Sequence, residues 1–480
     1  MASFETVIGL EIHVELDTKS KIFCGCSTKF GEEPNKNTCP VCIGLPGVMP
    51  VLNEEVVNLA VKAGKALNCD IQLINKMDRK NYFYPDLPKA YQISQFDLPI
   101  CTGGFIDLKI EGKNRRINLT RIHLEEDAGK LIHLEDSEDT LIDYNRGGVP
   151  LIEIVTEPDI RTAEEAVQFL KELRAILVYA GVSDCRMEQG SMRCDVNISV
   201  REVGSDILNT KVEIKNMNST KEVHKAIGKE EARQIQYYSY GEGHKVVQET
   251  RRWDAAKGRT ITMRTKEDAH DYRYFPEPDL PPIVISKDQV SVIASSLPEL
   301  PIAKKKRMIE EYGLTEKEVE ILIEEKTIAD FYEETVEKSG EPKESANWII
   351  TEVLRVLKSE STLPLSSKQL ADLIGEVRKG TISRTAAKEV FEGMIGTSLT
   401  VDKVIDQKGL RQISSEDALA SVVEEVLKLN PQAIEDYQGG KTQSFGFLMG
   451  QCMKASKGKG NPGVVKKILE EKLKNISIGE

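Results

Sequence analysis

The sequence INLTRIHLEEDAGK, residues 117–130, alternates apolar and polar residues over its first half. This period of two predicts a β-strand with one buried face. The strand then presents Arg121, His123 and Glu125 on one side and aliphatic residues on the other. A face that only contacts water would carry Thr, Ser or Lys, so a guanidinium, an imidazole and a carboxylate in succession indicate a functional site.

The same alternation recurs in two other stretches, GLEIHVEL and PLIEIVTE. The side chains that it places on one face are Glu11, His13 and Glu15 in the first stretch and Glu153 and Glu157 in the second. Carboxylates held together repel one another unless a cation lies between them, and oxygen ligands with an occasional imidazole suit Mg²⁺ or Mn²⁺. The three stretches therefore predict a sheet with one core face and one face that binds a metal and the phosphate of a nucleotide. A sheet with an ordinary solvated face is the alternative.

Length and charge limit the classes of protein to consider. A chain of 480 residues is too long for one ordinary core, so about two to four domains are expected. The formal net charge of −12 argues against a protein that coats nucleic acid non-specifically, although it allows a local basic patch. The opening MASFETVIGLEIHVEL has no basic segment before a short apolar run, and no stretch approaches the roughly 18 apolar residues of a membrane span. We therefore expect a soluble, cytoplasmic protein.

Four of the nine cysteines lie close together in the sequence: Cys24, Cys26, Cys39 and Cys42. They form C-x-C, a gap of twelve residues and then C-x-x-C, with glycine and proline between them for tight turns. This spacing is typical of a closed, tetrahedral structural zinc site in a reducing compartment. An iron–sulfur cluster and unligated thiols are the alternatives. A full shell of thiolates leaves no position for a substrate, so the predicted role is to fix a loop.

Two more alternating stretches, GSMRCDVNISV and KVEIKNMNS, bring basic residues beside the acidic strands. Arg193 and Lys215 from these stretches and Arg273 from the later DYRYFPEPDLPP are our predicted ligands of a nucleotide phosphate, although an exposed sheet with weak ion pairs would look the same. Residues 77–99 are also rich in aromatic and basic side chains, which suits a binding loop or an ordered surface loop. The sequence has neither a P-loop nor a Rossmann glycine motif, nor a G-x-S-x-G nucleophile elbow.

The proline-rich run at residues 276–301 marks a boundary, beyond which nearly all signals predict helices. The predicted helix caps, including two before this boundary, are Asn53, Thr162, Thr315, Ser366 or Ser367, Ser383 and Ser415. Residues 451–480 hold seven lysines against three glutamates, a net charge of +4. Lys454, Lys457 and Lys459 lie among glycines there and are predicted to contact RNA phosphates, with a solvated lysine loop as the alternative.

These motifs together resemble the B subunit of the aspartyl/glutamyl-tRNA amidotransferase, over the whole chain. The segments that carry the resemblance are FETVIGLEIHVEL, DRKNYFYPDLPKAYQISQFDLP, TRIHLEEDAGK, PLIEIVTEPDI, GSMRCDVNISV, ETRRWD, DYRYFPEPDLPP and GFLMGQCMKASKGKGNP. The resemblance implies a heterotrimer with an amidase, which is the A subunit, and a small C subunit. It also implies ATP-dependent phosphorylation of the side-chain carboxylate of Glu-tRNA(Gln) or Asp-tRNA(Asn), followed by amidation with ammonia that the amidase releases from glutamine.

The resemblance also implies roles for individual residues. It implies Mg²⁺ on Glu11, His13, Glu125 and Glu153, with Glu126 as a possible substitute for Glu125. The catalytic candidates are thus Glu125, Glu126 and Glu153, and the sequence leaves open which of them takes a proton from the attacking ammonium. The family keeps the cysteine quartet in some members, so its four intact thiols here imply bound zinc.

The implied fold is of the α+β class. It comprises a cradle of antiparallel sheet and helices similar to glutamine synthetase at residues 1–294, a helical domain at residues 295–405 and a small helical tail domain similar to the YqeY family, which touches tRNA, at residues 406–480. Two other functions compete with this one: a non-catalytic scaffold that binds tRNA, and a free-standing ligase that amidates a small carboxylate.

Overall fold

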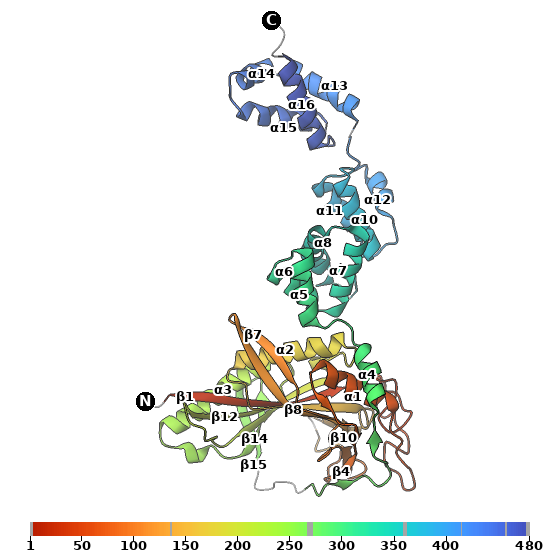
Figure 1. Cartoon of the computed structure of the whole chain (residues 1–480), viewed down its shortest axis with the longest axis vertical. Helices are drawn as coiled ribbons and strands as arrows, with labels where there is room; N and C mark the ends of the chain where they lie inside the picture. The colour runs from red at the N-terminus through yellow and green to blue at the C-terminus, as the bar shows by residue number, and fades with distance from the viewer. Residues whose placement is uncertain are drawn as a thin grey trace. The chain divides into compact units, whose positions relative to one another are not determined.

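The computed structural model describes residues 3–134, 137–265, 272–358, 362–413, 415–456 and 458–476. The chain separates into two compact units, Met1–Ala303 and Lys304–Glu480. The first combines a large, mostly antiparallel sheet with helices, and the second is built of helices (Figure 1). This confirms the predicted α+β class. No helix among the described residues is long and apolar enough to cross a membrane.

The strands belong to the first unit. They are β1 Phe4–Glu15, β2 Asp70–Ile71, β3 Ile74–Asn75, β4 Asp78–Asn81, β5 Tyr91–Ser94, β6 Cys101–Thr102, β7 Phe105–Ile110, β8 Lys113–Glu126, β9 Lys130–His133, β10 Thr140–Asp143, β11 Pro150–Thr156, β12 Met192–Glu202, β13 Val212–Lys215, β14 Glu249–Asp254, β15 Arg259–Thr265, β16 Phe275–Pro276 and β17 Ile283–Val284. Thirteen of them form one sheet, whose main path runs β15-β14-β13-β12-β1-β11-β8-β5-β4-β16.

The α-helices of the first unit are α1 Glu54–Ala66, α2 Ala163–Tyr179, α3 Thr220–Ser239 and α4 Lys287–Ser295, and α5 Pro301–Tyr312 begins at its end. Those that follow are α6 Glu316–Ile323, α7 Lys326–Ser339, α8 Pro342–Trp348, α9 Leu354–Leu357, α10 Ser367–Arg378, α11 Arg384–Met394, α12 Val401–Lys408, α13 Glu416–Leu429, α14 Pro431–Gln438, α15 Gln443–Ala455 and α16 Pro462–Ile476, with a π-helix at Ile349–Val353.

Strand β1 lies in the middle of the large sheet, between β11 and β12, and runs antiparallel to both. Its residues Leu10, Ile12 and Val14 are buried in a core with residues of α1, α2 and α3, which cover one face of the sheet (Figure 1). Burying each such side chain contributes about 1.5–3 kcal/mol. A slip of one residue would turn this apolar row to the other face, so the burial fixes the register that positions the site.

The predicted helix starts are confirmed. Thr162 accepts a hydrogen bond from the Glu165 N–H, and Thr315 forms a reciprocal capping box with Glu318. Of the two neighbouring serines predicted as a cap, Ser366 is the one that caps α10. Asn53, Ser383 and Ser415 cap α1, α11 and α13 in the same way. Each such cap stabilises its helix by about 1 kcal/mol.

The helices of the second unit enclose two separate hydrophobic clusters. One runs from Met308 to Ile405 and includes Trp348, whose ring packs on Phe391 at 5.9 Å between centroids. The other runs from Leu419 to Leu473. The predicted domain limits after residues 294 and 405 fall inside α4 and α12, and the division into three domains stays a prediction.

Candidate active site

A row of alternating imidazole and carboxylate groups crosses the face of the sheet that the helices leave uncovered. In the register of the strands, His13 of β1 lies opposite Glu153 of β11, and Glu153 lies opposite His123 of β8. The Glu153 carboxylate is 3.4 Å from His13 Nε2 and 3.2 Å from His123 Nε2. The two antiparallel pairings thus bring together residues that are far apart in the sequence.

Glu125 completes this group, which we name the central cluster: His13, His123, Glu125 and Glu153. Its side chain is nearly inaccessible to solvent, with 3% exposed, and its Oε1 is 3.3 Å from His13 Nε2. One ligand atom each from His13, Glu125 and Glu153 lies within 4.8 Å of the others, close enough to surround one metal ion. Buried His123 Nδ1 has no hydrogen-bond partner among the described residues.

The charges within the central cluster compensate one another. Burial lowers the pKa of His13, but hydrogen bonds and negative charges from Glu125 and Glu153 outweigh it and raise the pKa to about 10. Burial raises the pKa of Glu125, and His13 reverses this so that the pKa lies below its ordinary value. Glu125 and Glu153 thus favour the protonated form of His13. A metal ion that binds His13 must displace this proton, because only the neutral imidazole is a ligand.

Glu11 belongs to a second acidic group, together with Asp195 of β12 and Glu213 of β13. Asn197 donates a hydrogen bond to Glu11 at 2.9 Å, and the Lys215 ammonium lies 2.5 Å from Asp195 and 3.3 Å from Glu213. Burial and the charge of Glu153 raise the pKa of Glu11. The predicted Mg²⁺ ligands are thus divided: His13, Glu125 and Glu153 meet in one group, and Glu11 lies in the neighbouring one.

Members of both groups line one cavity of about 290 Å³, which is large enough for phosphate groups, while Glu125 and Asp195 are not in its lining. It is lined by Glu11, His13, Lys80, Arg121, His123, Glu153, Glu213, Lys215, Tyr272 and Tyr274. Of the three predicted phosphate ligands, Lys215 is in this lining. Arg193 and Arg273 are not, within the described part of the chain, and Arg193 instead forms an ion pair with Asp127 at 2.8 Å.

Sequence reasoning placed His123 on the functional face beside Glu125 but did not name it as a site residue, although the two alternate along the same strand face. It missed Asp195 and Glu213 as potential ligands and Lys80 as a cavity residue. Asp195 and Glu213 join Glu11 only through the strand order β13-β12-β1, which no pattern in the sequence states.

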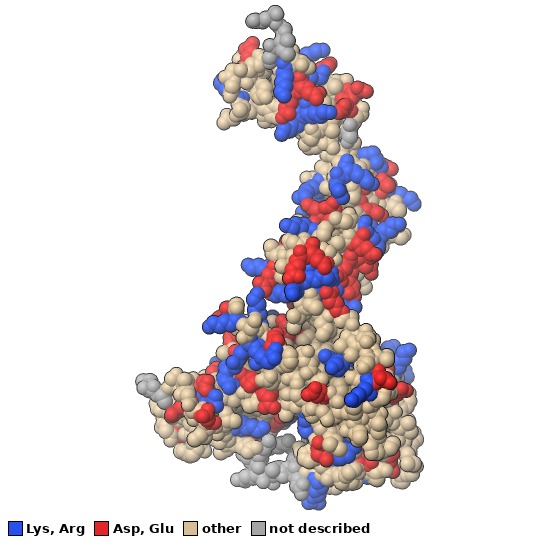
Figure 2. Space-filling model, viewed as in Figure 1, with Lys and Arg blue, Asp and Glu red and all other residues tan. Residues whose placement is uncertain are grey.

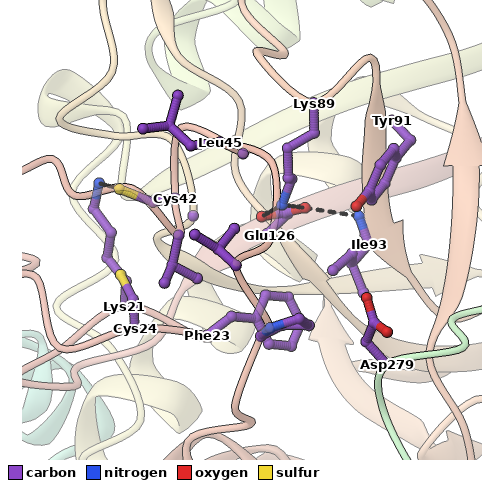
Figure 3. A pocket seen from close by; sticks show the side chains of 15 residues that line it. Lys21, Phe23, Cys24, Cys42, Leu45, Lys89, Tyr91, Ile93, Glu126 and Asp279 are labelled. Atoms are coloured by element: carbon purple, nitrogen blue, oxygen red, sulfur yellow. Dashed lines mark hydrogen bonds and ion pairs between the residues drawn. The ribbon is translucent and has the colours of Figure 1, made fainter.

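Glu126 lies apart from the central cluster. As the next residue along β8 it points to the opposite face, where its carboxylate contacts the Lys89 ammonium at 2.5 and 2.6 Å and accepts a hydrogen bond from the Ile93 N–H at 2.8 Å. These groups line a smaller pocket of about 90 Å³ (Figure 3). The structure therefore does not bring Glu126 to the position of Glu125.

The four cysteines of the predicted zinc site converge beside this pocket. Their sulfur atoms lie within 4.8 Å of one another, and Cys24 and Cys42 also line the pocket (Figure 3). The Cys39 N–H donates to Cys42 Sγ at 3.1 Å, and the buried Lys21 ammonium lies 3.8 Å from the same sulfur. Donors that face a sulfur favour the thiolate form, so this set of four thiols fits a tetrahedral zinc ion.

Of the predicted RNA-binding lysines, Lys454 lies in the last turn of α15 and Lys459 lies in the loop between α15 and α16. Lys454 and Lys459 are exposed, whereas Lys457 lies outside the described residues. The Lys459 carbonyl accepts a hydrogen bond from the Ile413 N–H at 2.7 Å, which holds this loop against the segment that precedes α13. On the face of the second unit seen in Figure 2, basic and acidic residues are intermixed. Lys454 and Lys459 are thus accessible to a ligand.

Comparison with known proteins identifies the chain. A family model described as "GatB/GatE catalytic domain" matches residues 6–291, and one described as "GatB domain" matches residues 330–473. B subunit 2 of the aspartyl/glutamyl-tRNA(Asn/Gln) amidotransferase from Clostridium acetobutylicum is 58% identical over 98% of this chain and 99% of its own length. The B subunit from Clostridium beijerinckii is 58% identical over 99% of this chain and all of its own length, and that from Thermoanaerobacter sp. is 53% identical over 98% and 99%.

The fold and the site define a catalytic subunit, in which an α+β domain carries an acidic cavity and helical parts follow it. The chain belongs to the family of aspartyl/glutamyl-tRNA(Asn/Gln) amidotransferase B subunits. This confirms the family that the motifs indicated.

Proposed function

We propose that this chain forms the amide in a tRNA-dependent amidotransferase. It phosphorylates the side-chain carboxylate of Glu-tRNA(Gln), Asp-tRNA(Asn) or both with ATP, and ammonia then displaces the phosphate to give Gln-tRNA(Gln) or Asn-tRNA(Asn). The observation that supports this most strongly is the cavity in which two acidic groups, two imidazoles and three cations meet on one sheet face. The names of its full-length relatives support the substrate class.

The residues of the cavity have distinct tasks in this reaction. His13, Glu125 and Glu153 would hold one Mg²⁺, and Glu11, Asp195 and Glu213 could hold another. Bound Mg²⁺ would neutralise charge between the phosphate and the incoming carboxylate. Lys215, fixed by Asp195 and Glu213, provides a positive charge for phosphate oxygens. The proton that the attacking nitrogen loses passes to a carboxylate of the central cluster, Glu125 or Glu153.

The proposed enzyme needs other chains. The sequence has no evident glutaminase nucleophile, so the nitrogen must come from a partner, which we propose is the amidase A subunit, bound together with a small C subunit as a heterotrimer. The exposed Lys454 and Lys459 are proposed to contact the tRNA. Free thiols throughout the described chain fit the reducing cytoplasm, which we propose as its location.

The test uses this chain assembled with its partner subunits, with ammonium in place of glutamine, Mg²⁺, labelled ATP and Glu-tRNA(Gln). We expect ADP and Gln-tRNA(Gln) to form together and only when the tRNA is present. ATP turnover on a small carboxylate without tRNA would instead support a free-standing ligase. Binding of tRNA without ATP turnover would support the non-catalytic scaffold.

We also propose that Cys24, Cys26, Cys39 and Cys42 hold a structural zinc ion. The double variant Cys39→Ser, Cys42→Ser should purify without zinc and unfold at a lower temperature than wild type, because a structural zinc site contributes to the free energy of folding. Elemental analysis and thermal unfolding measure both effects. Cys452→Ala, which alters a buried cysteine in α15 outside the quartet, is the control and should keep its zinc. Visible absorbance of the wild type would indicate an iron–sulfur cluster, and wild type without metal would indicate unligated thiols.

A further inference from the structure

Lys80 is a cation in the wall of the acidic cavity to which neither the sequence motifs nor the metal groups assign a role. It is the third residue of β4, a strand of only four residues, and is half-buried. The neighbouring Arg79 donates two hydrogen bonds to the Glu277 carboxylate, at 2.6 and 2.8 Å. Lys80 is the next residue of the strand, so its side chain points to the opposite side, where it lines the cavity. The strand therefore positions the ammonium on the side of the central cluster.

The other two cations of the cavity are engaged within the protein. Lys215 forms ion pairs with Asp195 and Glu213, and Arg121 donates a hydrogen bond to the Phe96 carbonyl at 2.8 Å. No described residue forms a hydrogen bond or an ion pair with the Lys80 ammonium, which lies 5.0 Å from the centre of the Tyr272 ring. Lys80 thus presents N–H donors to the cavity that a ligand can use.

Lys80 keeps its charge in these surroundings. Burial lowers its pKa, but the negative charges of Glu125 and Glu153 and the nearby tyrosines outweigh burial, so the pKa lies above its ordinary value. An ammonium that feels the charge of this carboxylate cluster, yet has no carboxylate partner among the described residues, is suited to an anion that enters with its own metal ion. A phosphate group is such an anion.

We propose that Lys80 is a catalytic residue, whose ammonium binds an oxygen of the phosphoryl group in transfer; this rests on the function proposed above. In that step the bond from the γ-phosphorus to the bridging β-phosphate oxygen breaks, and a bond from the phosphorus to the substrate's carboxylate oxygen forms. ADP departs, and Lys80 keeps its proton throughout. The positive charge stabilises the oxygens of the phosphoryl group where their charge is greatest.

The test measures tRNA-dependent ADP formation by the assembled enzyme, with Lys80→Met and Lys80→Arg beside wild type. We expect Lys80→Met to lower kcat by about a hundredfold to a thousandfold, as loss of a donor to a transition-state oxygen does elsewhere. KM for the tRNA should change little. Lys80→Arg should restore part of kcat, because arginine also carries a positive charge and N–H donors. If Lys80 only filled space, the charge of the replacement would not matter.

The control is Lys113→Met, which removes one positive charge from an exposed position at the start of β8. It should leave kcat unchanged. Wild-type kcat for ADP formation in Lys80→Met, or a loss of kcat that Lys80→Arg does not relieve, would overturn the assignment. Wild type that forms no ADP with Glu-tRNA(Gln) or Asp-tRNA(Asn) would overturn the proposed function itself, and the two failures are therefore distinguishable.

Discussion

Replacing Glu125 by Gln should abolish ATP-dependent amidation by the assembled enzyme while its affinity for tRNA stays close to that of wild type. Gln keeps the shape of the side chain but removes the charge that lies 3.3 Å from His13. One carboxylate fewer in the central cluster weakens Mg²⁺ binding and removes a candidate acceptor for the proton of the attacking nitrogen. We expect the rate of Gln-tRNA(Gln) formation from ammonium to fall by about a hundredfold or more. Glu125→Ala should act in the same direction.

Glu157→Gln is the matched control for this experiment. Glu157 directly follows β11 and accepts a hydrogen bond from Thr120 at 2.8 Å, outside the cavity. It should leave the rate of amide formation unchanged. Thermal unfolding of both variants shows whether the fold is intact. If Glu125→Gln forms ADP and amide at the rate of wild type, the acidic face is only a solvated surface, and a non-catalytic scaffold would explain the chain better. If the variant loses tRNA affinity instead, the role of Glu125 is structural.

The faces of the strands could be predicted from the sequence, because their alternation is strict. Leu10, Ile12 and Val14 of β1 are buried, and Glu11 and His13 face the cavity, as the pattern indicated. The same rule could have separated Glu125 from Glu126. Adjacent residues of a strand point to opposite faces, so the two cannot both be ligands of one ion on this sheet.

Other parts of the site could not be predicted, because they depend on the order of the strands and on local pairing. Charge alone suggested that Arg193 binds phosphate. Asp127, which directly follows β8, instead forms an ion pair with the Arg193 guanidinium. The position of Lys80 could not be predicted for another reason. Its strand is too short and too near prolines for an alternating pattern to be recognised, so the sequence predicts a loop there.

Deleting residues 415–480 should weaken tRNA binding and its dependence on salt, while the partner amidase still hydrolyses glutamine. The cut belongs at residue 415 rather than at the predicted limit of 406, because α12 contributes Val401, Val404 and Ile405 to the hydrophobic cluster of the preceding helices. The removed part has its own cluster, from Leu419 to Leu473, so the rest keeps its core. Each phosphate contact adds about 0.9 to the slope of log affinity against log salt, so losing the three predicted lysine contacts lowers the slope by up to about three.

Point variants separate the lysines from the rest of the deleted part. Lys454→Gln with Lys459→Gln should lower the affinity for tRNA and the salt slope in the same direction as the deletion, because both side chains are exposed. Lys472→Gln is the control, since its ammonium is already paired with Glu424 at 2.5 Å. Binding isotherms over a series of salt concentrations provide the slopes. Affinity and slope that stay at wild-type values in the double variant would show that these lysines contact only water, and the tRNA would then have to be held by other residues.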